Sequence, residues 1–320
     1  MPIYKNIFCL SILASAVLLS ACQPKGDAPK ESTAPEVVQT EPEVIKLTGE
    51  TEKLKLTIPE CEDKSCPEIS IERLNSNQSF INEWIDQQIL QQLKSILSVD
   101  AIEPAKETAA SEAETAASKP KAALTTVATP KQQLEQQIQP YIQTFLNLDK
   151  ELKALSASHS ISLMIKPKIL NSGDPLATVV LNSSYYLGGA HGASAQTYYN
   201  FDLEQQKLVK LDDIIATKQK AKLETRAYEA FKDWVVDSKL AKDVAEYEQA
   251  WKFKLSDNFY LAQQGLVLQY AEYEIGPYVA GLPRLMIPYE QLQGVLKPEY
   301  LPHTENAASE IKPAPAAKAK

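Results

Sequence analysis

The chain has 320 residues, of which 44% are hydrophobic and 23% are charged, and its formal net charge at pH 7 is -8. The hydrophobic share is sufficient for an ordinary globular core, and the length suits one or two domains. A chain this acidic is a poor candidate for binding nucleic acid or anionic lipid, so we expect neither. The acidity favours encounter with a cationic partner or serves solubility alone, and the composition leaves both open.

The N-terminus has the pattern of a bacterial signal peptide that ends in a lipobox. Lys5 precedes an apolar run from Ile7 to Leu19, which is followed by two small residues and Cys22. Because the run is too short to cross a bilayer as a helix, a retained signal anchor is the weaker interpretation. The pattern predicts lipidation of Cys22 and attachment to the membrane through the lipid alone. Gln23 is compatible with the outer membrane, so we expect a periplasm-facing anchor there.

Composition and periodicity divide the chain into six segments. Large apolar residues are scarce after the lipobox, in the Ala- and Glu-rich middle and in the Lys- and Pro-containing tail. Such segments cannot bury a core, so we expect them to be disordered. The predicted organisation is a signal peptide (1–21), a disordered lipid tether (22–50), a small αβ module (51–100), a low-complexity insertion (101–129), a larger α+β domain (130–302) and a disordered tail (303–320).

The first module begins with two stretches of alternating apolar and polar residues, Leu54–Ile58 and Ile69–Leu74. The alternation predicts two strands of a hairpin. Cys61 and Cys66 lie between the strands and are the only cysteines left after the leader and the lipidated residue. An exported chain favours a disulfide between them, although a metal or redox pair is the alternative.

Two amphipathic helices are expected next in the chain. Apolar residues recur at helical spacing over 80–97, with Ser79 available as the N-cap. A second helical pattern covers 134–148 and contains Pro140, which should kink or split that helix.

The remaining elements alternate without strict βαβ order. We expect strands at 161–165 and 176–186, a hairpin formed by 199–203 and 208–211, helices at 223–235 and 240–251, and closing strands at 259–261, 266–270 and 285–287. This order predicts an α+β fold with antiparallel sheets and packed helices. Trp84, Trp234 and Trp251 lie on apolar helical faces, so they are expected to pack in the core.

Several short motifs resemble those of one domain family. They are Tyr185–Gly192, Tyr199–Leu203, Leu211–Asp213, Asn258–Leu261, Tyr273–Gly281 and Ile287–Tyr289. In this order the motifs resemble the extracytoplasmic domain of RsiV-type anti-sigma factors, over about Ser158 to Leu292. The resemblance implies binding, since RsiV-type domains recognise lysozyme and related modules are joined to polysaccharide deacetylases. Because this chain has no sigma-binding segment or transmembrane helix, the signalling role is not expected to apply.

Six residues within these motifs are candidates for ligand binding: Tyr185, Tyr186, His191, Tyr273, Glu274 and Tyr278. Tyrosines close to a carboxylate suit carbohydrate or protein contacts, because each combines an apolar ring with a hydroxyl. His191 lies among glycines in an expected turn, where it either contacts ligand or forms a local hydrogen bond that locks the turn. The segment around Tyr278 is equally open to a purely structural role at a sheet edge.

No pattern in the chain identifies a catalytic residue, a metal site or a cofactor site, and we expect none of the three. Zinc usually takes three or four protein ligands, but the other histidines, His159 and His303, lie far from His191 in the sequence. Glu274, Asp202 and Asp213 could complete a site only in principle. The predicted function is that of a lipid-anchored envelope protein that binds a lysozyme-like protein or peptidoglycan. The alternatives are a cell-wall hydrolase or deacetylase and a passive structural lipoprotein.

Overall fold

The computed structural model describes residues 45–62, 65–97, 128–155 and 160–302. The predicted signal peptide, Cys22, the tail and nearly all of the low-complexity insertion lie outside these residues. The tether was expected to reach residue 50, but the chain is already ordered at Leu47, which is buried and donates its N–H to Ser172 O.

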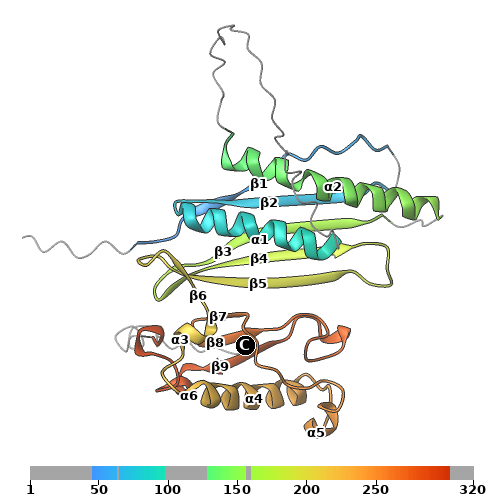
Figure 1. Cartoon of the computed structure of the whole chain (residues 1–320). Coiled ribbons are helices and arrows are strands. Elements are labelled where there is room, and N and C mark those ends of the chain that lie inside the picture. Colours follow the sequence, from blue (N-terminus) through green and yellow to red (C-terminus); the bar gives the residue numbers. More distant parts are fainter. Residues whose placement is uncertain (1–44, 63–64, 98–127, 156–159, 303–320) are drawn as a thin grey trace, which may run out of the picture. The chain divides into compact units, whose positions relative to one another are not determined.

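A six-stranded sheet is built from the first two thirds of the chain, in the order β1-β2-β3-β4-β5-β6 (Figure 1). All neighbouring pairs are antiparallel except β2 and β3, which are parallel. β4 is apolar along most of its length and lies at the centre, as its sequence predicted. The strands are β1 Gly49–Lys53, β2 Glu68–Ser76, β3 Ser162–Gly173, β4 Leu176–Tyr186, β5 Ala193–Asp202 and β6 Lys207–Val209.

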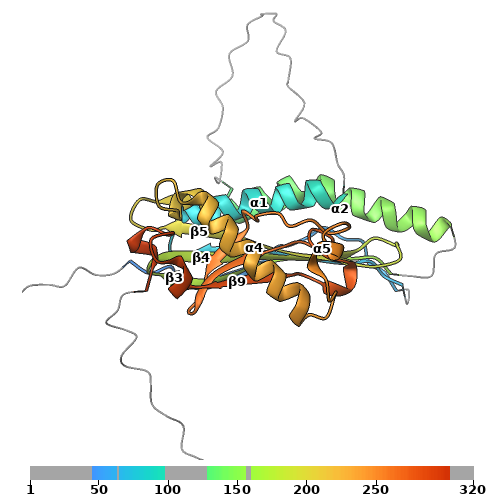
Figure 2. The same ribbon diagram turned by 90° about the horizontal axis from the view of Figure 1, so that it is seen from below.

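Helices α1 (Ser79–Leu97) and α2 (Pro130–Ala154) cover one face of this sheet (Figures 1 and 2). Each helix buries an apolar stripe at helical spacing, and the stripes share one core with β2, β3, β4 and β5. The hydroxyl of Thr129 accepts the N–H of Gln132, whose side chain accepts the N–H of Thr129 in return. This capping box fixes the start of α2. Pro140 does not split the helix, which continues to Ala154.

The remaining elements form a second core around a three-stranded antiparallel sheet, β7-β8-β9. Helix α4 packs against β9 and contributes an apolar stripe to this core. The elements are α3 Leu211–Ile214, α4 Lys220–Asp237, α5 Val244–Tyr247, β7 Phe259–Leu261, β8 Gly265–Gln269, the 3-10 turn η1 Tyr278–Ala280, β9 Arg284–Pro288, α6 Tyr289–Leu292 and the 3-10 turn η2 Pro298–Tyr300.

Side-chain amides connect the two sheets. Asn258, just before β7, accepts the N–H of Tyr198 at 2.8 Å and donates to Gln196 O at 2.7 Å. Asn200 on β5 donates to Phe259 O at 2.8 Å. The two amides therefore supply, between β5 and β7, hydrogen bonds of the kind that a backbone ladder would supply.

The predicted α+β class with antiparallel sheets is confirmed, while two element predictions are wrong. The segment 240–251 forms only the single turn α5, because Asp243 caps a new helix start and Lys239 has a positive φ of 56°. The first strand ends at Lys53 rather than covering 54–58. Lys55 N–H bonds to Glu135 of α2 instead of continuing the ladder.

The expected small module at 51–100 does not have a core of its own. Residues of α1 and β2 share one apolar cluster with α2, β3 and β4, which belong to the segment expected as a separate domain. The reason is that β2 pairs in parallel with β3, which makes the β1–β2 hairpin part of the six-stranded sheet.

Candidate binding site

Two loops that are far apart in the sequence meet beside the end of β4. One is the turn 187–192 between β4 and β5, and the other is the segment 270–283 between β8 and β9. The Tyr278 hydroxyl donates to Gly192 O at 3.1 Å, and the N–H of Ser194 donates to Glu272 Oε1 at 3.1 Å. These two bonds hold the segment 270–283 against the turn and against the start of β5.

Four aromatic rings form a row across this contact. The rings of His191 and Tyr278 are stacked with centroids 4.7 Å apart, and those of Tyr278 and Tyr273 are stacked at 5.7 Å. Trp251 continues the row, at 6.5 Å from Tyr273 with a tilt of 30°. We call these four residues the aromatic row. Since Tyr273 is 54% exposed and Tyr278 is 36% exposed, the middle of the row is open to solvent.

The backbone on both sides of the row has unusual conformations. Gly188 has φ 87°, and a Cβ at this position would lie 2.8 Å from Leu152 Cδ1 on α2. Glycine is favoured there by its conformation, whereas the Leu152 side chain could shift to make room for a Cβ. Tyr273 has φ 64° although it is not a glycine, a conformation that costs free energy and is concentrated at functional sites.

The structure brings together three of the six predicted ligand-binding residues, His191, Tyr273 and Tyr278. Glu274 lies next to them in sequence, but its carboxylate accepts the N–H of Ala271 at 2.9 Å and lies 3.6 Å from Lys254 Nζ. Its visible role is thus to close a local turn. Tyr185 and Tyr186 are not part of the row, and Tyr185 packs against the core beneath α1 and α2.

Trp251 is the member of the row that the sequence did not indicate. It was expected in the core, and it does pack partly against the second apolar cluster. Its ring also meets Tyr273 because the chain between α5 and β7 is irregular rather than helical. No local sequence pattern could have shown this contact, which depends on the path of that segment.

The acidic residues considered for a catalytic or metal site have local structural roles. Asp202 Oδ1 accepts the N–H of Gln205, and Asp213 Oδ2 accepts the N–H of Lys210. Within the described ranges, no three His, Cys, Asp or Glu side chains are grouped so that they could hold a metal ion. Those ranges also contain no helix long and apolar enough to cross a membrane. His159 and His303 lie outside them.

Comparison with known proteins identifies part of the chain. Residues 204–290 match the family described as "Protein of unknown function (DUF3298)". This part of the chain is therefore similar to DUF3298 domains. DUF3298 domains are typical of extracytoplasmic proteins. The match begins after β5, so the domain contributes Trp251, Tyr273 and Tyr278 to the row, while His191 comes from outside the matched residues.

Two solved structures have a similar fold. A DUF3298 family protein from Pseudomonas aeruginosa PAO1 is 23% identical, with a TM-score of 0.55, and the match covers 80% of this chain and 95% of that one. A DUF3298 family member from Bacteroides fragilis NCTC 9343 is 21% identical, with a TM-score of 0.50 and coverage of 79% and 93%. The similarity extends well beyond residues 204–290, so the six-stranded sheet belongs to the shared fold.

A curated relative is similar over part of its length. The chain is 26% identical over 169 residues to the peptidoglycan-N-acetylmuramic acid deacetylase PdaC of Bacillus subtilis (strain 168). The match covers 49% of this chain but only 34% of that protein. The chain therefore corresponds to about a third of the deacetylase.

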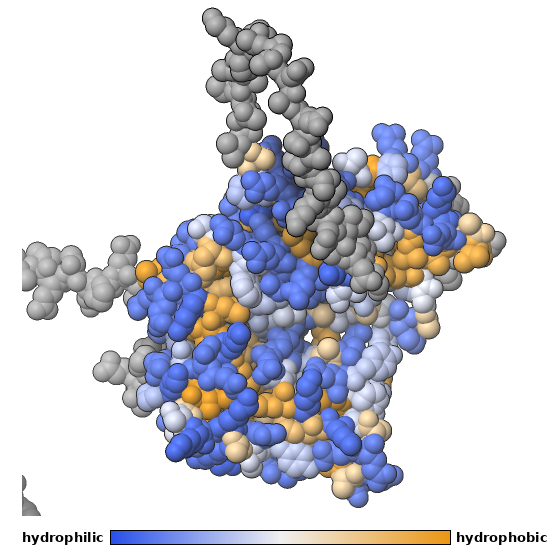
Figure 3. Space-filling view, viewed as in Figure 1, coloured by the Kyte–Doolittle hydropathy of each residue, from blue (hydrophilic) through white to orange (hydrophobic). Residues whose placement is uncertain are grey.

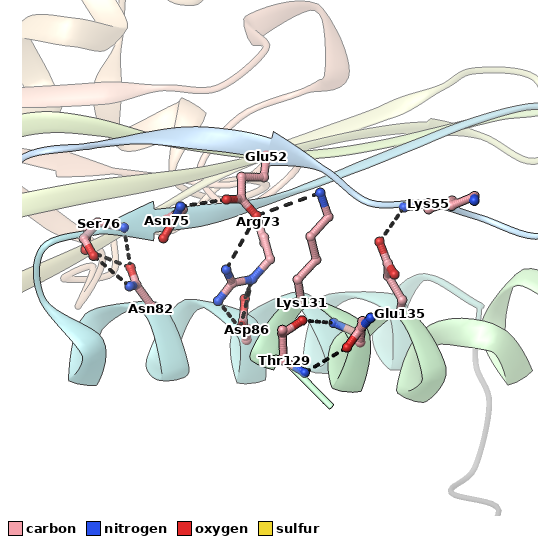
Figure 4. A network of polar contacts seen from close by, with 11 residues as sticks. Glu52, Lys55, Arg73, Asn75, Ser76, Asn82, Asp86, Thr129, Lys131 and Glu135 are labelled. Atoms are coloured by element: carbon pink, nitrogen blue, oxygen red, sulfur yellow. Dashed lines mark hydrogen bonds and ion pairs between the residues drawn. The ribbon is translucent and has the colours of Figure 1, made fainter. Parts of the chain in front are cut away.

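A second polar cluster lies between the β1–β2 hairpin and α1 (Figure 4). Arg73 is 5% exposed and donates to both carboxylate oxygens of Asp86, with the shortest contact 2.8 Å. Glu52 lies 3.8 Å from Arg73 and 3.8 Å from Lys131 at the start of α2. Burial raises the pKa of Asp86 above its ordinary value, although Arg73 opposes this rise. Because each charge already has a partner, this cluster is better explained as a stabilising contact between the hairpin and the two helices than as a ligand site.

The disulfide between Cys61 and Cys66 lies in the loop that follows β1, with a Cα–Cα distance of 5.8 Å. It closes the β1–β2 connection, as expected for an oxidising compartment.

Proposed function

We propose that this chain is a binding protein of the bacterial cell envelope, anchored through a lipid on Cys22 and facing the periplasm from the outer membrane. The aromatic row is the proposed contact surface for a ligand, and a cell-wall component, peptidoglycan, is the proposed ligand. The single observation that supports this proposal most is the row of four rings, which is open to solvent at Tyr273 and Tyr278 and joins three segments of the chain. Exposed rings with polar edges are typical of surfaces that bind sugars and proteins.

Two further observations support a ligand in the cell wall. The partial relative from Bacillus subtilis is named for a reaction on peptidoglycan, and the segment shared with it is about a third of its length. The strained conformation of Tyr273 is kept at an exposed position, where stability alone gives little reason for it. A binding role for the shared segment is consistent with both.

A lysozyme-like protein is the second candidate ligand. The resemblance to RsiV-type domains implies it, and the net charge of -8 favours encounter with a basic protein. The finer identification as an RsiV-type domain belongs to this proposal, and the signalling function is not part of it.

The first experiment is sedimentation of the purified unlipidated chain with peptidoglycan sacculi. We expect the chain to co-sediment and Tyr278→Ala to bind about tenfold more weakly, a loss of roughly 1.4 kcal/mol of binding free energy. Tyr278→Phe keeps the ring and should lose less. Val279→Ser is the matched control, because Val279 is 86% exposed in the same loop but is not part of the row.

Two outcomes would decide against this version. Equal sedimentation of Tyr278→Ala and the native chain, with unchanged thermal unfolding, would remove the row from the binding surface. If the chain does not co-sediment with sacculi but is retained on immobilised lysozyme at moderate salt, a lysozyme-like protein would replace peptidoglycan as the proposed ligand. Release of acetate or of wall fragments that His191→Ala abolishes would instead favour the enzyme alternative.

A further inference from the structure

Two neighbouring hollows lie beside Tyr300, away from the residues of the aromatic row. One has a volume of about 550 Å³ and lies between the β3–β4 turn, the β7–β8 turn and the last described residues. The other, of about 530 Å³, lies between the same β3–β4 turn and the β5–β6 turn. Asp174, Pro175 and Tyr300 line both hollows, which we treat together as the Tyr300 groove.

The Tyr300 groove is lined by both apolar and acidic residues. Tyrosines from three elements line it, together with Leu170, which is 46% exposed. Its acidic residues are Asp174, Asp202, Glu204 and Glu299, and no lysine or arginine is among the described residues that line it. Burial raises the pKa of the Tyr300 hydroxyl, and the nearby carboxylates of Glu299, Asp202 and Asp213 raise it further. The groove therefore suits a ligand that is both apolar and cationic.

An exposed apolar surface does not by itself identify a site. Figure 3 shows hydrophobic patches scattered among hydrophilic residues on the face it displays, which is usual for a soluble domain. The Tyr300 groove differs in two respects. All charged residues that line it are acidic, and it lies beside the last described residues, Leu301 and Pro302.

The sequence that follows the groove has the required chemistry. Pro302 lines the groove, and the segment from Lys312 to Lys320 reads KPAPAAKAK, with three lysines, two prolines, four alanines and no acidic residue. Prolines favour the extended polyproline II conformation, which aromatic grooves bind at low entropic cost. The nine residues 303–311 could span at most roughly 30 Å, which allows the segment to turn back along the groove.

We propose that residues 312–320 bind in the Tyr300 groove of the same chain and act as a built-in competitor for cationic, proline-containing peptides. This inference is independent of the aromatic row and of the proposed function. Connection through a short segment gives the bound residues an effective concentration in the millimolar range, so a weak contact suffices to fill the groove.

The test compares the chain 23–320 with the chain 23–310, using a synthetic peptide of residues 311–320. Isothermal titration should show peptide binding to the shortened chain and binding about tenfold weaker to the full one, because the tethered copy competes. A peptide with its three lysines changed to glutamine should bind the shortened chain at least about tenfold more weakly. Higher salt should also reduce binding of the native peptide.

A pair of double variants locates the site. Asp174→Asn with Glu299→Gln should reduce peptide binding to the shortened chain, whereas Glu60→Gln with Glu62→Gln removes the same charge from the β1–β2 loop and should not. Equal binding to the full and shortened chains, or no binding to either, overturns the proposal. Equal losses in the two double variants would also overturn it, since general attraction to an acidic protein would then explain the result.

Discussion

Arg73 holds a positive charge where only 5% of the residue is exposed, and its guanidinium meets a carboxylate whose pKa is raised by burial. A buried ion pair of this kind adds little stability compared with apolar residues, but losing one partner is costly. The remaining charge is then left in a poorly solvated position, so its protonation state determines how much stability is lost.

Arg73→Met should lower the free energy of unfolding by about 3–5 kcal/mol at neutral pH, because Asp86 stays charged without its partner. Asp86 already has a raised pKa, so its charged form is disfavoured in the folded state and protonation as pH falls favours folding. The loss caused by Arg73→Met should therefore shrink as pH falls towards the ordinary aspartate range near 3.8. Urea unfolding at a series of pH values measures this.

Arg73→Met combined with Asp86→Leu is the control, since it removes both charges and should recover most of the stability. A loss for Arg73→Met that is the same at acidic and neutral pH would show that packing, and not the charge of Asp86, is responsible.

At the scale of elements, strongly periodic segments could be predicted and irregular ones could not. The apolar stripes of α1 and α4 and the alternation in β3 and β9 correspond directly to buried faces. The segment 240–251 has aromatic residues at helical spacing as well, yet only Val244–Tyr247 is helical. Tertiary contacts determine the conformation of that segment. Tyr247 is an example, because its hydroxyl donates to Ile275 O at 3.0 Å.

Gly276 makes that packing testable. A Cβ added there would lie 2.8 Å from the Tyr247 hydroxyl oxygen and 3.0 Å from Trp234 Cη2. Gly276→Ala should therefore lower the free energy of unfolding by about 1–3 kcal/mol, as overpacking usually does. Thermal unfolding followed by circular dichroism measures this, with Gly189→Ala as the control because its nearest neighbour would be 3.9 Å away. Similar melting temperatures for the two variants would contradict the close packing.

The same contrast holds for the candidate site. His191, Tyr273 and Tyr278 could be selected because tyrosines, glycines and a histidine gather in short motifs. That they stack on one another could not be predicted, because the turn 187–192 and the segment 270–283 are separated by β5 to β8 in the sequence. Only the pairing of whole elements brings them together.

At the scale of the whole molecule, two apolar cores are connected in part by side-chain amides. One core lies between the six-stranded sheet and helices α1 and α2, while the other surrounds the three-stranded sheet and also takes in Leu176 of β4 and Val209 of β6. Asn258 and Asn200 supply hydrogen bonds between β5 and the β7 region. The sequence offered no sign of two cores with these boundaries, since apolar residues are spread evenly over both. Cooperative unfolding of the chain then depends on how strongly these amides couple the cores.

Asn258→Ala removes two of the connecting hydrogen bonds and leaves Tyr198 N–H and Gln196 O without those partners. We expect a loss of about 2 kcal/mol and, more tellingly, weaker coupling of the two cores. Differential scanning calorimetry should give a calorimetric enthalpy close to the van't Hoff value for the native chain and clearly above it for Asn258→Ala. Asn182→Ala is the matched control, because Asn182 donates to Lys166 O and accepts from Gln196 inside a single sheet. If both variants keep a single cooperative transition, the cores are coupled by packing between the sheets and not by the Asn258 amide.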